Sequence, residues 1–219
     1  MRTDQWLGRL VQIGASLLAI NILSAAPLAA KTAVKIVALG DSLTAGFGVA
    51  PADAFPAQLE RALKASGQAV ELVNSGVSGD TAADGLDRLD WAVPDDAKAV
   101  IVELGANDGL RGIDPKATRA TLNAVLTRLN ARKLPVLLTG MRAPRNWGDA
   151  YAKEFDAMFA DLAAAHGVLL YPFFLDGVVL DLALNQADGL HPNAKGVAVI
   201  VERITPHVEG LLGKVSAGP

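Results

Sequence analysis

The sequence contains no cysteine among its 219 residues. Disulfide bridges, thiolate nucleophiles and cysteine-ligated zinc are therefore excluded. Histidine is also scarce, with only His166, His191 and His207, so few side chains can serve as a base near neutral pH. Lys and Arg number 20 against 23 Asp and Glu, and no basic patch of the kind that neutralises phosphates is visible. This charge balance argues against nucleic acid as a partner.

A membrane-spanning run is missing as well. Residues 10–23 are mostly apolar but short for a spanning helix, and polar residues interrupt them. Arg2 and Arg9 flank a basic start and small residues follow, which predicts a secretory signal over residues 1–30 with a cut after Ala30. An uncleaved N-terminal anchor is the alternative. The predicted product is periplasmic or secreted and keeps no stable membrane anchor.

Beyond residue 30, short β-branched runs alternate with longer amphipathic segments. Nearly continuous apolar character is typical of parallel strands covered on both faces. The predicted strands are residues 34–39, 69–74, 99–104, 134–140 and 168–171. The predicted helices are residues 55–66, 115–132, 149–166 and 192–212. This alternation predicts a three-layer α/β fold, and the lack of repeats or linkers predicts one domain over residues 31–219.

Unusual chemistry follows the first three strands, in residues 40–48, 75–81 and 105–112. Open parallel sheets bind ligands beyond the carboxyl ends of their strands, so these three loops are the expected site. Ser42 lies in the first loop, where the chain turns toward a helix. Ser42 can be interpreted in two ways, either as a helix N-cap or as a nucleophile that projects into a cleft. Asp41 beside it is expected to order the turn through its carboxylate.

His191 is the best candidate for a base. It precedes Pro192, which disfavours helical geometry at position 191 and places the imidazole at a helix entrance. Asp188, three residues earlier, can accept from Nδ1 and fix the tautomer. His166 closes a helix and His207 lies within the last helix, where solvent exposure is expected. The alternative is a loop aspartate with an incidental histidine.

A hydrolase also needs donors aimed at a developing oxyanion. The Gly79 N–H, the Asn107 side-chain NH₂ and the Ser42 N–H can supply three. Gly-rich strand exits and Asn-Asp-Gly are also ordinary turn chemistry. A G-x-S-x-G nucleophile elbow is absent from the sequence, so the common α/β-hydrolase motif is not present.

Four blocks of the sequence resemble the motifs of the SGNH (GDSL-type) hydrolases. They are Gly40-Asp41-Ser42-Leu43, Gly79, Asn107 with Asp108, and Asp188-x-x-His191, in the family's order over residues 34–212. Longer stretches, residues 104–112 and 78–81, look most like the bacterial multifunctional thioesterase I/lysophospholipase/arylesterase subgroup.

The resemblance implies a flavodoxin-like fold with a five-stranded parallel sheet. It implies Ser42 as nucleophile, His191 as base and Asp188 as its partner, with Ser42, Gly79 and Asn107 as the oxyanion hole. It implies no metal and no organic cofactor.

In that subgroup the loop after the third strand is mobile and lines the acyl site, which here corresponds to residues 108–112. Leu110 and Arg111 lie in this loop, and Trp147 lies in the polar stretch 142–149, where surface exposure is expected; these three are the predicted substrate-binding residues. Met141, Phe173 and Phe174 are further groove candidates, although core packing is favoured for the two phenylalanines. Arg142 and Arg145 can attract anionic head groups or coenzyme A phosphates, and solvated surface charge is the simpler interpretation.

The predicted function is hydrolysis of small-molecule acyl esters or thioesters by a monomeric serine enzyme. A carbohydrate O-acetylesterase with the same motifs is the alternative within enzymes. A catalytically silent binding module is the alternative from another class, although the intact motif set argues against it. A flavodoxin-like phosphoacceptor domain using Asp41 ranks last, because no matching acidic metal site and lysine are evident in the sequence.

Overall fold

The computed structural model describes residues 32–217. The predicted signal segment and the cut after Ala30 lie outside the described residues. Five parallel strands form one sheet in the order β2-β1-β3-β4-β5. They are β1 Val34–Gly40, β2 Val70–Gly76, β3 Ala99–Glu103, β4 Val136–Thr139 and β5 Leu169–Tyr171.

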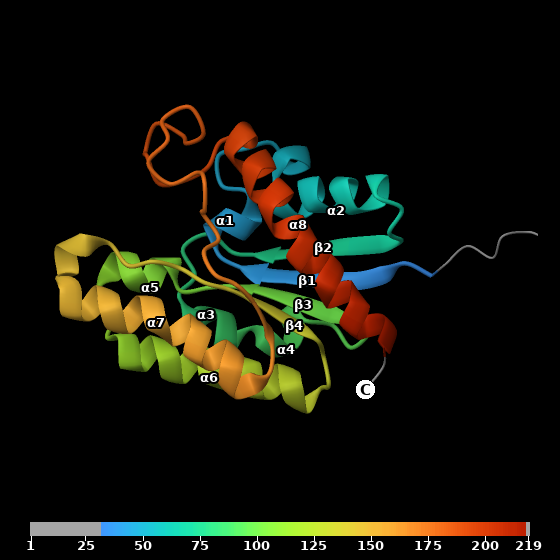
Figure 1. The fold of residues 1–219 in the computed structure, drawn as a ribbon, viewed down its shortest axis with the longest axis horizontal. Coiled ribbons are helices and arrows are strands. Elements are labelled where there is room, and N and C mark those ends of the chain that lie inside the picture. The colour runs from blue at the N-terminus through green and yellow to red at the C-terminus, as the bar shows by residue number, and fades with distance from the viewer. Residues whose placement is uncertain (1–31, 218–219) are drawn as a thin grey trace, which may run out of the picture. The chain divides into compact units, whose positions relative to one another are not determined.

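Helices cover both faces of this sheet (Figure 1). One face carries α2 Phe55–Ala65 and α8 Ala194–Ala217, which pack against each other. The other carries α3 Ala82–Asp87, α4 Leu89–Ala92, α6 Pro115–Ala131 and α7 Asp149–His166. The predicted three-layer α/β fold and its flavodoxin-like strand order are confirmed.

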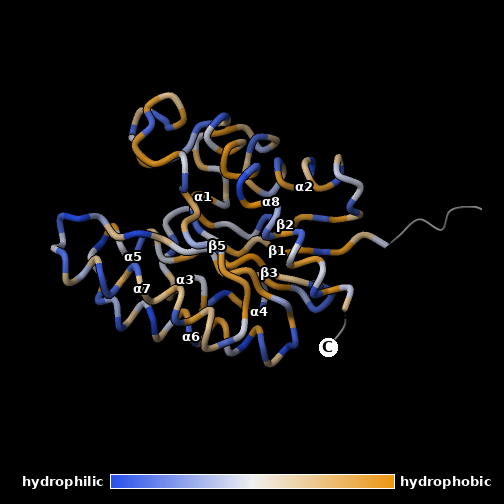
Figure 2. The backbone as a smooth tube through the Cα atoms, in the orientation of Figure 1, coloured by the Kyte–Doolittle hydropathy of each residue, from blue (hydrophilic) through white to orange (hydrophobic). Residues whose placement is uncertain are grey.

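The core of the described chain follows from the apolar strands. Every residue of β3 and β4 is buried, as are the last five residues of β1, because helices cover both sides of these strands. Figure 2 shows the hydrophobic colour concentrated along the central strands. Phe55 of α2 meets Phe174 edge to face, with ring centroids 5.0 Å apart, so Phe174 is a core residue. Within residues 32–217, no helix combines the length and apolar character needed to cross a membrane.

Short elements at the carboxyl edge of the sheet differ from the expected loops. Residues 42–45 form α1 Ser42–Ala45, and the segment after β3 forms α5 Ala106–Arg111 rather than an open loop. Gly105 and Gly112, both with positive φ, bound α5 at its two ends. Short 3₁₀ turns occur at Pro51–Asp53 and Arg145–Trp147.

The expected bounds of the last helix and the expected exposure of His207 are wrong. The helix ends at Ala217 rather than at about residue 212. It begins at Ala194 rather than at position 192, because Asn193 Oδ1 accepts from the Lys195 and Gly196 N–H groups and caps it. His207 does not face solvent freely. Its ring packs edge to face on Tyr171, with centroids 4.9 Å apart.

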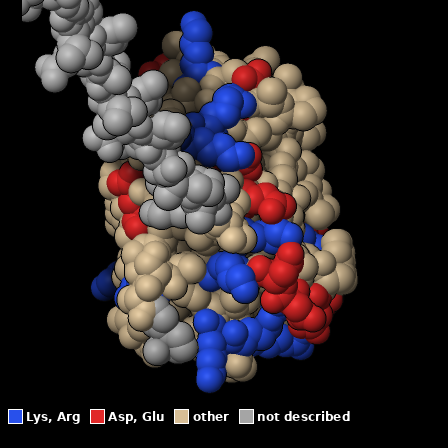
Figure 3. Space-filling view, turned by 90° about the vertical axis from the view of Figure 1, so that its right-hand side faces the viewer, with Lys and Arg blue, Asp and Glu red and all other residues tan. Residues whose placement is uncertain are grey.

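Charges are mixed on the face at the amino ends of the strands. Figure 3 shows Lys and Arg interspersed with Asp and Glu on this face. Among the described residues there, Lys35 contacts both Asp96 and Glu71. This mixture offers no continuous basic surface of the kind that nucleic acids require.

Candidate active site

Ser42 is the first residue of α1, directly beyond the carboxyl end of β1. The N-cap of this short helix is Asp41, whose Oδ1 accepts from the Leu43 N–H at 2.9 Å. The predicted structural role of Asp41 is therefore confirmed, and Ser42 is not the cap. Because β1 lies inside the sheet between β2 and β3, Ser42 follows an interior strand at the carboxyl edge.

A continuous hydrogen-bond chain joins Ser42 to two residues from the far end of the sequence. Ser42 Oγ lies 2.9 Å from His191 Nε2, and His191 Nδ1 lies 2.6 Å from Asp188 Oδ2. Since an ionised carboxylate can only accept, Nδ1 carries the proton and Nε2 is free to accept from the serine hydroxyl. This is the geometry of a serine activated by a histidine that a carboxylate orients.

Asp188 is held in its charged form. Its Oδ1 accepts from the backbone N–H groups of His191 and Leu190, at 3.0 and 2.9 Å. The His191 N–H bond, the imidazole bond and the Leu190 N–H bond together lower the pKa of Asp188 to about 2. The carboxylate is thus a permanent acceptor beside Nδ1.

The three predicted oxyanion donors lie on neighbouring segments. Within residues 32–217, the N–H groups of Ser42 and Gly79 donate to no protein acceptor. Asn107 Nδ2 donates to Asp41 Oδ2 at 3.1 Å and to the Asp80 carbonyl at 3.0 Å. Its amide is therefore fixed between the turn after β1 and the loop after β2. Their role as an oxyanion hole stays a prediction.

A buried carboxyl pair, Asp41 and Glu103, lies next to Ser42, and Glu103 was not anticipated from the sequence. Glu103 at the end of β3 is fully buried, and its Oε2 accepts from the Asp41 N–H and from Thr44 Oγ1, at 3.3 and 2.7 Å. Burial raises the pKa of Asp41 to about 6. Burial, and then the neighbouring Asp41 charge, raise the pKa of Glu103 well above its usual range. The sequence signal that could have identified Glu103 is its position as the one charged residue at the end of an otherwise apolar strand.

Arg88, at the junction of α3 and α4, stabilises the turn that precedes Ser42. Its Nε donates to Asp80 Oδ2 at 2.6 Å and its Nη2 donates to the Gly40 carbonyl at 2.8 Å. Both side chains of this ion pair are nearly buried. The strand end that precedes Ser42 is thus tied to the loop that carries Gly79.

Two more residues position the His191 ring and the segment that carries it. Phe47 packs on the His191 ring, with centroids 4.6 Å apart. Gln186 Nε2 donates to the Phe47 carbonyl at 2.7 Å and to the Pro192 carbonyl at 2.9 Å. This amide therefore connects the segment after α1 to the segment that carries His191. No motif in the sequence marks either residue.

A cavity of about 480 Å³ opens beside Ser42 and His191. Its walls are mostly apolar, and they include Leu110, Met141, Phe173, Leu175, Val179 and Leu180. The predicted groove residues Leu110 and Met141 lie in it, and Phe173 is buried and also contributes to the wall. Arg142 lies over the Phe173 ring at 4.5 Å, whereas Arg145 pairs with Asp156.

Arg111 and Trp147 do not line this cavity. Arg111 Nη2 donates to the Gly79 carbonyl at 2.8 Å, and Trp147 Nε1 donates to the Gly109 carbonyl at 2.9 Å. Both side chains therefore support the loops around the site in this structure. Their predicted contact with substrate stays a prediction.

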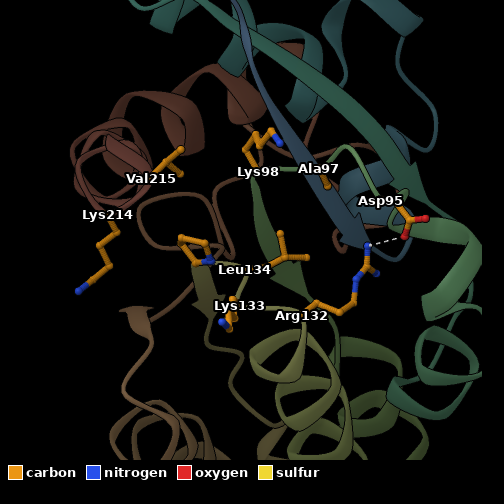
Figure 4. Close-up of a pocket in the computed structure, with 9 residues that line it drawn as sticks. Asp95, Ala97, Lys98, Arg132, Lys133, Leu134, Lys214 and Val215 are labelled. Carbon is orange, nitrogen blue, oxygen red and sulfur yellow. Dashed lines mark ion pairs between the residues drawn. The ribbon is translucent and has the colours of Figure 1, made fainter. Parts of the chain in front are cut away.

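A second cavity, of about 550 Å³, lies at the opposite edge of the sheet. Lys98, Arg132, Lys133 and Lys214 are among its lining residues (Figure 4). Figure 4 shows Lys214 on one side and the Arg132–Asp95 pair on the other, so these cations do not converge on one point. This arrangement does not build an anion site.

Comparison with known proteins decides the family. Residues 38–199 match the GDSL-like Lipase/Acylhydrolase family. The chain belongs to this family. Its relatives include the esterase TesA of Pseudomonas aeruginosa, 35% identical over 178 residues, which covers 81% of this chain and 89% of the relative. Thioesterase 1/protease 1/lysophospholipase L1 of Escherichia coli is 36% identical over 184 residues, covering 84% and 87%.

Solved structures agree with this assignment. AlinE4, an SGNH-hydrolase family esterase, is 43% identical with a TM-score of 0.70, covering 82% of this chain and 97% of that chain. The predicted membership of the SGNH (GDSL-type) hydrolases is confirmed. The chain is therefore an enzyme of the ester- and thioester-hydrolase class that acts on a small-molecule substrate.

Proposed function

We propose that this SGNH hydrolase cleaves acyl esters and thioesters through an acyl-enzyme on Ser42. The observation that carries the proposal is the hydrogen-bond chain from Ser42 Oγ through His191 to Asp188, at the edge of a mostly apolar cavity. A hydroxyl is a weak nucleophile unless a base removes its proton during attack. Here His191 Nε2 lies within hydrogen-bond distance of Ser42 Oγ, and Asp188 fixes the tautomer of the imidazole.

The proposed reaction has two halves. In the first, Ser42 Oγ attacks the acyl carbon while His191 Nε2 takes the hydroxyl proton. The tetrahedral intermediate collapses when His191 returns that proton to the leaving alcohol or thiol, which leaves the acyl group on Ser42. In the second, a water gives its proton to Nε2 and attacks the acyl-enzyme. Collapse releases the carboxylic acid and restores the Ser42 hydroxyl.

The oxyanion is assigned to the N–H groups of Ser42 and Gly79 and to the Asn107 amide. The two backbone donors have no other protein acceptor within the described chain, so they are available to a developing charge. The Asn107 amide donates to Asp41 Oδ2 and to the Asp80 carbonyl at ordinary N–H···O distances of 3.1 and 3.0 Å, which hold Nδ2 beside the site. The oxyanion of a tetrahedral intermediate is a more basic acceptor than a carboxylate or a carbonyl oxygen, so we expect it to compete for an Nδ2 proton.

The cavity supports an acyl chain longer than acetyl. Apolar side chains form most of its wall, and burying a chain there removes apolar surface from water. The proposed substrates are aryl esters, lysophospholipids and acyl-CoA thioesters. Carbohydrate O-acetyl groups are the alternative, since they need the same catalytic residues and less of the wall.

The proposed setting is the periplasm or the extracellular medium. This rests on the signal pattern of residues 1–30, with the cut after Ala30. The proposed mature protein is a monomer with no stable membrane anchor. N-terminal sequencing of the exported protein tests the cut, and sedimentation equilibrium tests the monomer.

Turnover of p-nitrophenyl esters from acetate to palmitate, with acyl-CoAs alongside, tests the chemistry. Ser42→Ala is expected to abolish turnover, whereas the control Ser66→Ala is expected to keep it, because the Ser66 hydroxyl only closes α2 on the Leu63 carbonyl. A fluorophosphonate probe is expected to label position 42. Retained activity in Ser42→Ala contradicts the mechanism. Activity confined to acetate favours the O-acetylesterase, and inactivity on every substrate favours the silent binding module.

A further inference from the structure

The segment between β5 and α8 projects from the body of the fold at the carboxyl edge of the sheet (Figure 1). We call residues 178–184 within it the leucine tip. Leu180 and Leu182 are 86% and 87% exposed, and Val179 is 47% exposed. Single exposed apolar residues are common, but these three are close together in one short segment.

The leucine tip is held in this form by its own hydrogen bonds. Asn185, which is buried, donates through Nδ2 to the Val178 and Asp181 carbonyls at 2.6 and 2.8 Å. Leu180 has a φ of 65°, which is rare for a residue other than glycine and costs about 1–2 kcal/mol. Val178 is fully buried while Leu180 and Leu182 point outward. The conformation of the leucine tip thus exposes Leu180 and Leu182 to solvent while Val178 anchors the segment in the core.

The tip is continuous with the wall of the active-site cavity. Val179 and Leu180 belong both to the tip and to that wall, so an acyl chain lying against the tip reaches Ser42 along apolar surface. On another part of the wall Arg142 is exposed and stacks on Phe173. It forms no ion pair with any carboxylate in residues 32–217. An unpaired guanidinium is complementary to a lipid phosphate.

We propose that the leucine tip is a docking surface for the surface of a phospholipid or lysophospholipid aggregate. Leu180 and Leu182 enter the acyl region, Arg142 meets a phosphate, and the substrate passes from the aggregate to Ser42 without crossing bulk water. The proposal rests on the proposed acyl-hydrolase function, because that function explains why a lipid surface meets this edge. The Asp181 carboxylate between the two leucines favours zwitterionic over strongly anionic surfaces.

Binding is measured apart from catalysis, in protein that carries Ser42→Ala. Flotation with phosphatidylcholine vesicles gives the partition coefficient, and every variant keeps the same N-terminus, so that differences report on the tip. Leu182→Ser is expected to lower the partition coefficient about tenfold, because about 1.4 kcal/mol of favourable leucine burial is lost. Leu182→Met keeps an apolar side chain and is the matched control that is expected to bind as before.

Catalysis is the second readout, in protein with Ser42 intact. Leu182 does not line the cavity, so Leu182→Ser is expected to keep kcat/KM on soluble p-nitrophenyl acetate. Its rate on micellar lysophosphatidylcholine is expected to fall about as much as the partition coefficient does. If the protein with Ser42 and Leu182 both intact binds vesicles but hydrolyses no ester, that result contradicts the proposed function and not the docking.

Three results overturn the docking proposal. The first is no flotation of the Ser42→Ala protein, and the second is equal flotation of Leu182→Ser and Leu182→Met. The third is a dimer in sedimentation that Leu182→Ser converts to a monomer without vesicle binding in either form. That third result assigns the tip to contact with a second copy of the chain.

Discussion

The buried Asp41–Glu103 pair makes the stability of this enzyme depend on pH in a way that one substitution reveals. Asp41→Asn replaces the carboxylate by a neutral group of the same shape. Asparagine is as good an N-cap as aspartate, so the bond to the Leu43 N–H is retained. The bond from Asn107 Nδ2 is weakened or lost, which lowers the unfolding free energy by about 1 kcal/mol at every pH.

The pH-dependent part follows from the raised pKa. In an unfolded chain Asp41 ionises with an ordinary pKa of 3.8, and in the folded protein with a pKa of about 6. Between these values the folded protein holds a proton that the unfolded chain has released, so the wild-type unfolding free energy falls as pH rises. Because the two pKa values differ by roughly two pH units, this fall amounts to about 3 kcal/mol and is complete near pH 7. Asp41→Asn has no such fall.

Urea unfolding of both proteins at pH values from 4 to 7 measures the effect. The wild type is expected to be the more stable protein at pH 4 and the less stable one at pH 7. Burial is the larger cause of the raised pKa of Glu103, and it is present in both proteins. Asp87→Asn, at an exposed carboxylate, is the control and is expected to run parallel to the wild type. A difference between wild type and Asp41→Asn that stays constant with pH refutes the reasoning.

Three further expectations concern the site and its backbone. Asn107→Ala is expected to lower kcat by roughly 10²–10³ with little change in KM, measured by steady-state kinetics, and an unchanged kcat would make Asn107 purely structural. Asp188→Asn is expected to lower kcat by roughly 10⁴, because an amide does not enforce the His191 tautomer. The stabilising contribution of Asp188 is present above pH 3.8 and lost as pH falls through about 2, so wild-type assays near neutral pH leave its carboxylate charged. Gly40→Ala is expected to lower the unfolding free energy by roughly 1–3 kcal/mol or more, because the new Cβ overlaps the Thr44 hydroxyl. The control Gly213→Ala, in open space on α8, is expected to stabilise the protein slightly, and calorimetry compares the two Tm values.

The sheet could be predicted from the sequence because each strand is a short apolar run with a helical segment after it. Boundaries were less predictable, since single side chains set them. The Asn193 cap moves the start of α8 past Pro192. Segment 106–111 follows a strand and contains Asn-Asp-Gly, which predicts a loop, but the segment is helical. Gly109 lies against Phe155, where a side chain would be crowded.

The residues of the proposed triad could be selected from the sequence because histidine is scarce and Ser42, Asp188 and His191 fall in recognisable motif blocks, and the structure brings the three side chains together. The residues that hold them in place were missed. Glu103, Arg88 and Gln186 act through tertiary contacts with backbone groups far away in sequence, and no local pattern encodes such contacts. Trp147 was chosen for its polar surroundings, but its indole bonds to the Gly109 carbonyl rather than lining the cavity.

The path of the chain through the sheet has a consequence for when the enzyme becomes active during synthesis. Ser42 is made early, whereas His191 follows it by 149 positions and precedes only the last helix. A ribosome that has reached the end of β5 has produced Ser42 but neither Asp188 nor His191. Under the proposed mechanism, chains that end before His191 are inert toward esters, and hydrolytic activity reports that the segment carrying His191 has docked.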